Sequence, residues 1–203
     1  IETWLSDAEL ASFPCSYSTA ENMLTRAKVT ENDTLLITGA SGGVGSAAIQ
    51  LAKARGARVI AVAGDSKQQS VLDVGADQAL VRGASLEAAL GENGVDVVVD
   101  LVGGADWPDL LTILRPFGRY AVSGAIAGPI VELDLRTLYL KDQQLLGCTV
   151  LDDGVFSRLV GLIEQGDIKP LLARSFALES LAEAQAFFLD KQFTGKLVID
   201  MAL

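Results

Sequence analysis

The feature that most constrains the fold is an alternation of short apolar segments with helical segments, which begins at Thr34. The segments of strand length are TLLIT, RVIAVA, QALV, VDVVVDLV and RYAVSG, and stretches of helical pattern separate them. Strands joined in this way are parallel and need right-handed crossovers. The sequence therefore predicts an α/β fold, a doubly wound parallel sheet with helices on both faces.

A glycine-rich loop directly follows the first of these strands. From Ala40 onward the chain reads A-S-G-G-V-G, which is the G-x-G-x-x-G pattern with alanine in its first place. In this pattern Gly42 lets the backbone approach a diphosphate and Gly45 lets the helix pack on the strand, while N–H groups at the helix start face the anion. The setting between strand and helix predicts a Rossmann dinucleotide site rather than a plain glycine turn. Its expected coenzyme contacts are Ser41, Gly42, Gly43, Val44 and Gly45.

The end of the second strand bears on the choice of coenzyme. NAD-binding domains place an acidic residue there to accept hydrogen bonds from the ribose. Here the position is Ala63, and Ser66 and Lys67 follow as donors to a 2'-phosphate. The pattern therefore favours NADP. NAD remains an alternative if Asp65 reaches the ribose, and Ser66 with Lys67 could instead be an ordinary helix start.

Composition excludes several classes of function. The net charge is −10, which argues against a general nucleic-acid binder because phosphate-backbone affinity needs clustered Lys and Arg. There is no histidine, so this chain alone cannot supply a Ser-His-Asp triad or a His-ligated metal. Two distant cysteines fit a reducing compartment, and no apolar run reaches the roughly 18 residues that cross a bilayer. We therefore expect a cytoplasmic protein that binds neither nucleic acid nor membrane.

The segments outside the main alternation also have recognisable patterns. Two helices are expected before the first strand, over 6–13 and 18–28, and the second has a capping-box pattern at Ser18 and Glu21. A turn is expected at Gly118, ahead of RYAVSG. After Pro170 the tail reads strand, helix, strand. The chain begins with Ile1, which suggests that it was cut from a longer polypeptide.

The stretch GASGGVGSAAIQLAKARGARVIAVAG resembles the medium-chain dehydrogenase/reductase superfamily, which includes zinc alcohol dehydrogenases and quinone oxidoreductases. The likeness continues through VDVVVDLVGG, LYLKDQQLLGCTV and FTGKLVID. It implies a coenzyme-binding C-terminal portion: 1–30 as a lead-in from a missing catalytic domain, 31–170 as the Rossmann domain and 171–203 as a return segment. It also implies a homodimer paired through the edge strand QQLLGCTV.

The resemblance also implies roles for residues outside the glycine loop. Cys15 stands where zinc alcohol dehydrogenases have a third protein ligand of the catalytic metal, although it could be a small buried residue of a zinc-free reductase. Thr19 matches a threonine near the nicotinamide. Further positions carried over lie at the ends of the fourth and fifth strands: Asp100, Val102, Gly103, Ser123 and Gly124.

These features lead to one functional hypothesis and one alternative. The chain is expected to be the NADP-preferring coenzyme-binding portion of an oxidoreductase, which transfers hydride between nicotinamide and an alcohol, aldehyde or activated alkene. The missing domain would contact this small-molecule substrate, so the isolated chain would bind coenzyme weakly and turn over nothing. The alternative is a non-catalytic dinucleotide-binding sensor or structural module.

Overall fold

The main structural unit is a six-stranded parallel sheet. The computed structural model describes residues 1–201, and the strand order is β3-β2-β1-β4-β5-β6. From β1, third in this order, the chain winds through β2 to β3 and then returns to the other side of β1 for β4, β5 and β6. The predicted doubly wound α/β fold is therefore confirmed. The strands are β1 (Thr34–Ile37), β2 (Arg58–Ala63), β3 (Gln78–Val81), β4 (Val95–Asp100), β5 (Leu114–Val122) and β6 (Gln144–Gly147).

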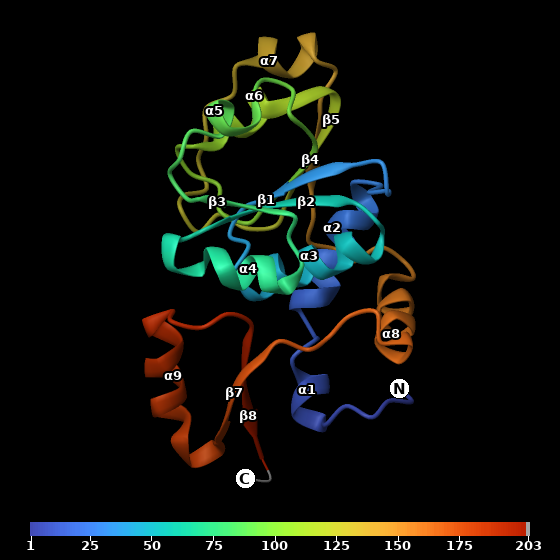
Figure 1. Cartoon of the computed structure of the whole chain (residues 1–203), viewed down its shortest axis with the longest axis vertical. Helices are drawn as coiled ribbons and strands as arrows, with labels where there is room; N and C mark the ends of the chain where they lie inside the picture. Colours follow the sequence, from blue (N-terminus) through green and yellow to red (C-terminus); the bar gives the residue numbers. More distant parts are fainter. Residues whose placement is uncertain (202–203) are drawn as a thin grey trace.

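Helices cover both faces of this sheet, which explains the continuous apolar character of its central strands. Leu35 and Ile37 of β1 pack into one hydrophobic cluster, while Leu36 between them packs into the cluster on the opposite face. The first cluster lies under α2 (Ser16–Arg26), α3 (Gly43–Ala54), α4 (Gln68–Val74) and α8 (Val155–Gln165). The second lies under α5 (Leu86–Leu90) and α6 (Trp107–Ile113) (Figure 1). None of the helices in the described part of the chain is long and apolar enough to span a bilayer.

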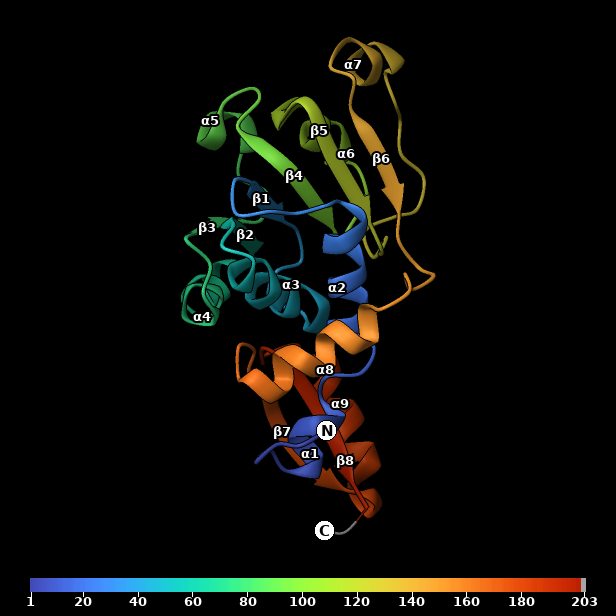
Figure 2. The same ribbon diagram turned by 90° about the vertical axis from the view of Figure 1, so that its right-hand side faces the viewer.

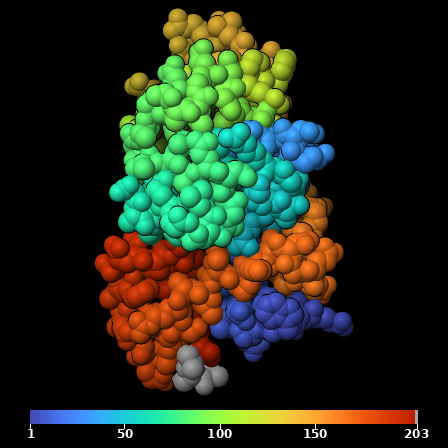
Figure 3. Space-filling model, viewed as in Figure 1, coloured from blue at the N-terminus to red at the C-terminus, as the bar shows by residue number. Residues whose placement is uncertain are grey.

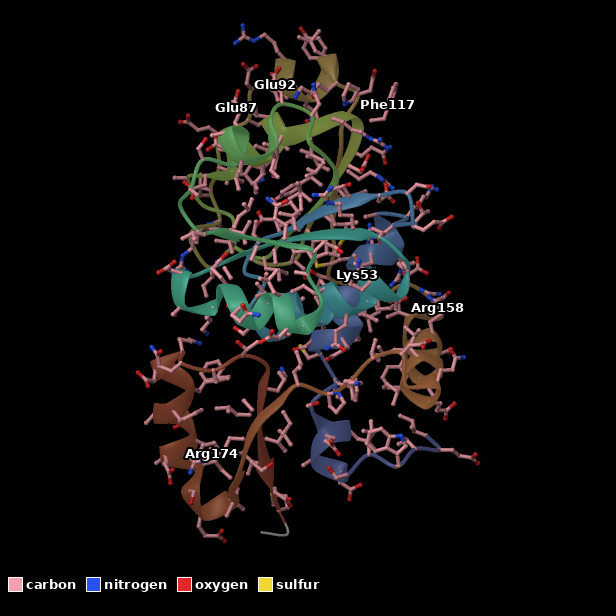
Figure 4. All side chains as sticks on the ribbon, viewed as in Figure 1. Lys53, Glu87, Glu92, Phe117, Arg158 and Arg174 are labelled. Carbon is pink, nitrogen blue, oxygen red and sulfur yellow. The ribbon has the colours of Figure 1, made fainter. Side chains whose placement is uncertain are left out.

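A second, smaller sheet is built by the tail of the chain. Strands β7 (Leu172–Ala177) and β8 (Lys196–Asp200) are parallel, with η2 (Leu178–Ser180) and α9 (Leu181–Asp190) between them. Arg174 of β7 pairs with Glu183 of α9 at 3.0 Å and lies on the Phe176 ring (Figure 4). The short helix α1 (Asp7–Ala11) contacts both strands, so the N-terminal and C-terminal segments lie together (Figure 2). The first 30 residues are thus divided, since α2 packs on α3 and α8 instead.

Two local predictions differ from the structure. The capping box is not at Ser18, because α2 already begins at Ser16 and Glu21 is buried in ion pairs with Arg55 and Arg158. The box that does form joins Ser6 and Glu9, at the start of α1. A turn is predicted at Gly118 ahead of the fifth strand, whereas β5 already begins at Leu114 and the local irregularity, with a φ of +62° at Phe117, lies inside it. Gly118 itself lies within β5, where the register against β4 shifts.

Candidate functional site

The glycine loop joins the end of β1 to the start of α3. Gly42 is the N-cap residue of α3, and no side chain caps this helix. A Cβ at Gly45 would lie 2.4 Å from the Gly39 carbonyl oxygen and 2.6 Å from the Ala40 Cα, which no side chain tolerates. The helix start therefore packs directly on the loop backbone, and its first N–H groups lack partners within the helix.

Alanine fits the first place of the glycine pattern because its neighbour makes the turn. Gly39 has a φ of +59°, in the left-handed region that favours glycine. Ala40 has a negative φ, is fully buried, and donates its N–H to the Val62 carbonyl at 3.1 Å. The departure from the usual pattern therefore leaves the loop geometry intact.

A basic side chain that sequence analysis did not single out lies beside the loop. A Cβ at Gly43 would lie 2.8 Å from Ser16 Oγ and 3.0 Å from Lys196 Cδ. Ser16 belongs to α2 and Lys196 to β8, so three distant segments meet at this point. Lys196 lies within FTGKLVID, but nothing in its local spacing marks it as a neighbour of the loop.

At the end of β2, the predicted coenzyme-selecting residues occupy a short helical turn, η1 (Asp65–Lys67). Ala63 is buried, while Asp65 and Ser66 are exposed. Lys67 Nζ donates to the Phe193 carbonyl at 2.7 Å. Burial and the positive charge of Lys191 both lower the pKa of Lys67. Lys67 belongs to η1 and Lys191 to the tail, so this repulsion acts between the tail and the Rossmann unit, whose surfaces meet in Figure 3.

Asp100, at the end of β4, organises the turn that follows it. Its carboxylate is fully buried and accepts hydrogen bonds from Thr38 Oγ1 at 2.6 Å and from the Tyr120 hydroxyl. It also accepts from the Val102 and Gly103 N–H groups, at 2.9 and 3.2 Å. The side chain is thus used within the protein, where it links the ends of β1, β4 and β5. Burial first, and then the hydrogen bond to Asp100, raise the pKa of Tyr120.

The ends of β5 and β6 border two hollows. The larger, of about 530 Å³, is lined in part by Arg26, Ser123, Gly124, Thr149 and Val150. The smaller, of about 260 Å³, has Gly103 and again Gly124 in its wall. The predicted residues at these strand ends are therefore brought together on one edge of the sheet.

Cys15 and Thr19 lie one helical turn apart at the start of α2, where the Thr19 N–H donates to the Cys15 carbonyl at 2.9 Å. Cys15 is exposed and has a φ of +66°, so it is not a small buried core residue. Within residues 1–201, no group of three or more His, Cys, Asp or Glu side chains could hold a metal ion. The described residues do not by themselves form a metal site.

The strand order and the loop together define a class of domain. The glycine loop follows β1, at the point where the winding of the sheet reverses, and dinucleotides bind at such switch points in α/β sheets. The architecture is that of a dinucleotide-binding Rossmann domain.

The family follows from comparison with known proteins. The model of the zinc-binding dehydrogenase family matches residues 43–165, more than half of the chain, and the chain belongs to this family within the medium-chain dehydrogenase/reductase superfamily. The predicted resemblance is therefore confirmed.

Three relatives illustrate the similarity. Acryloyl-coenzyme A reductase of Metallosphaera sedula is 32% identical over 98% of this chain and 60% of its own length. Quinone oxidoreductase-like protein 2 of Bos taurus is 32% identical over 95% of this chain and 60% of its own. A crystal structure from Sinorhizobium meliloti 1021, provisionally assigned as an alcohol dehydrogenase, is 52% identical, with a TM-score of 0.91 over 97% of this chain and 56% of that one. The chain thus spans about 60% of the length of its curated relatives.

Proposed function

We propose that this chain is the coenzyme-binding portion of an NADP-preferring oxidoreductase that transfers hydride between nicotinamide and an alcohol, aldehyde or activated alkene. The observation that carries the proposal is the uncapped start of α3 behind a loop in which Gly45 leaves no space for a side chain. Free N–H groups at a helix start bind a diphosphate. The bound nicotinamide would supply the hydride chemistry, and the protein would supply its position.

The topology sets the direction in which a dinucleotide would lie. The end of β2 is where such domains contact the adenosine ribose, so the nicotinamide half would extend toward the ends of β4, β5 and β6. Thr19, Val102, Gly103, Ser123 and Gly124 are the proposed contacts on that side. Lys196 beside Gly43 would add a positive charge next to the diphosphate.

Preference for NADP is supported by the charges at the adenosine end. Lys67 follows β2, and the charge of Lys191, after burial, lowers the pKa of Lys67, so two positive charges would be available to a 2'-phosphate at this end of the site. No acidic side chain stands at the strand-end position itself, which is Ala63.

The substrate class is supported by the names of the relatives. One relative is named acryloyl-coenzyme A reductase and another quinone oxidoreductase-like protein 2. The third is provisionally assigned as an alcohol dehydrogenase. Because the chain spans only about 60% of the curated relatives, we assign substrate contacts to residues outside these 203. Cys15 remains a predicted zinc ligand that would need partners from outside the described residues. No step is assigned to a metal.

Calorimetric titration with NADPH and NADH tests the proposal. We expect NADPH to bind the unmodified chain more tightly. Lys67→Gln should weaken NADPH binding about tenfold, because a charge-assisted hydrogen bond to phosphate is lost, and should change NADH binding little. The matched control is Lys28→Gln, an exposed lysine just after α2. Tighter binding of NADH than of NADPH by the unmodified chain would contradict the coenzyme preference.

A further inference from the structure

A buried side-chain amide on α2 makes hydrogen bonds to the backbone of a loop far along the chain. Asn22 is 1% exposed. Its Nδ2 donates to the Val150 carbonyl at 3.1 Å, and its Oδ1 accepts from the Asp152 N–H at 2.9 Å. Both ends of one side chain therefore hold the backbone of the segment that follows β6.

The segment begins at Cys148, which is buried and donates its N–H to the Val122 carbonyl at 2.9 Å, and residues 149–152 after it are exposed. Residues 148–152 form neither helix nor strand, and Val150 is 79% exposed. Thr149 and Val150 nevertheless line the larger hollow, together with Ser123 and Gly124 at the end of β5. The position of this wall thus depends on how the backbone of the segment is held.

The helix that carries Asn22 is itself firmly anchored. One residue earlier, Glu21 accepts hydrogen bonds from Arg55 of α3 at 2.6 Å and from Arg158 of α8 at 3.2 Å (Figure 4). One turn earlier, the Tyr17 hydroxyl donates to the Lys169 carbonyl at 2.8 Å. Because these contacts hold α2 in place, the Asn22 side chain can hold the loop in a defined position.

We propose that Asn22 is a positioning residue for the nicotinamide half of the coenzyme, acting through the Thr149–Val150 wall of the larger hollow. The inference rests on the proposed function, which places that half at the ends of β5 and β6. The adenosine half would lie at η1, at the end of β2, which β1 and β4 separate from β5 along the same edge of the sheet. Loss of the Asn22 contacts should therefore change affinity for one half of the ligand only.

The test compares NADPH with 2',5'-ADP, which has the adenosine half and the 2'-phosphate but no nicotinamide. In the unmodified chain, the ratio of the dissociation constant for 2',5'-ADP to that for NADPH is the gain in affinity from the nicotinamide half. Asn22→Ala should reduce that gain about threefold to tenfold, because two hydrogen bonds that order the wall are lost, and should leave 2',5'-ADP binding unchanged. Asn22→Leu fills the same volume without the amide, and it should give the same result if the alanine variant does not fold.

The matched control is Gln143→Ala. Gln143 is also a buried amide with two bonds to backbone carbonyls, those of Leu111 at 2.9 Å and Leu114 at 3.1 Å. It precedes β6, at the opposite end of the strand from Val150, so its loss should lower stability without changing the gain from the nicotinamide half.

Three outcomes distinguish the inference from the function on which it rests. If the unmodified chain binds NADPH more tightly than 2',5'-ADP and the Asn22 variants keep the whole difference, Asn22 is merely structural and the inference is overturned. If the unmodified chain binds neither ligand, the proposed function itself fails. An equal loss of both ligands in the Asn22 variants, with the folded state intact, also overturns the inference.

Discussion

At the scale of single residues, the shape of the glycine loop depends on close backbone contacts that leave no space for a side chain. Gly45 contacts the loop carbonyl so closely that the helix start and the loop form one rigid unit, whereas a Cβ at Gly42 would lie 3.3 Å from the same carbonyl oxygen. The two glycines thus have different physical roles. One is required for packing, and the other leaves the anion side of the helix uncovered.

We expect Gly45→Ala to lower the free energy of unfolding by about 1–3 kcal/mol, as overpacking does, and to abolish measurable NADPH binding because the helix start is displaced. Urea unfolding and calorimetry measure the two effects. Gly42→Ala is the matched comparison and should cost less stability. A Gly45→Ala chain that unfolds and binds like the unmodified one would rule out the close packing.

Tyr120 gives a pH-dependent prediction. Its pKa is raised in the folded chain and is near 10 when unfolded, so its contribution to stability is complete below about pH 10 and is lost as the pH rises further. The unfolding free energy of the unmodified chain should therefore fall above that pH, and more steeply than that of Tyr120→Phe.

Denaturant unfolding between about pH 8 and 11 measures this slope. The control is Tyr139→Phe, on the exposed side of α7 (Leu135–Leu140), which should leave the slope unchanged. Identical slopes for Tyr120→Phe and the unmodified chain would contradict burial of the neutral phenol. At neutral pH the same variant should lose about 1–3 kcal/mol, since Asp100 loses a donor.

At the scale of elements, β6 is one of the two edge strands of the large sheet, the other being β3. It pairs only with β5 among the described strands, and Leu145 on it is partly exposed. Apolar side chains are also exposed on the adjoining loop and on α7: Ile126, Ile130, Leu135, Tyr139 and Leu140. An uncovered apolar edge invites pairing with another strand, and we propose a second copy of the chain as its partner.

Leu145→Lys should therefore convert a dimer into a monomer, because a charged side chain on an edge strand opposes strand pairing. Sedimentation velocity measures the change. Leu72→Lys on α4 is the control, since that side chain is exposed to a similar degree away from the edge. An unmodified chain that sediments as a monomer at high concentration would exclude this partner.

The sequence predicted most elements, for reasons that also explain the errors. Strands buried on both faces read as continuous apolar runs, and VDVVVD is wholly buried in β4. Ser18 and Glu21 matched a capping pattern, but long-range ion pairs at Glu21 determine its environment. Lys196 beside the loop and Asn22 at the β6 turn could not be predicted, because their partners are more than a hundred residues away along the chain.

At the scale of the whole molecule, the described residues supply one side of the proposed coenzyme site. The Rossmann sheet supplies the loop and the strand ends. The tail contributes Lys196 beside Gly43, and Lys191 and the Phe193 carbonyl near Lys67. The described residues contain no set of metal ligands and no histidine for proton transfer. Because the chain spans only about 60% of the length of its curated relatives, we expect ligand binding and turnover to be separable in it.

We expect the purified chain to bind NADPH weakly and to show no reductase activity with acryloyl-coenzyme A or a quinone, and no dehydrogenase activity with alcohols. Absorbance at the reduced-nicotinamide band follows turnover, and calorimetry on the same sample shows that the coenzyme site is intact. Turnover by the purified chain would contradict our assignment of the catalytic groups to residues outside it.

The closeness of Lys196 to Gly43 has a consequence for biosynthesis. During synthesis Gly43 of the glycine loop is added more than 150 residues before Lys196, which lies beside it in the folded chain. A nascent chain can form the central strands and α3 well before β8 exists. The full surroundings of the loop are therefore complete only after β8 has been synthesised, so coenzyme capture should follow the synthesis of β8.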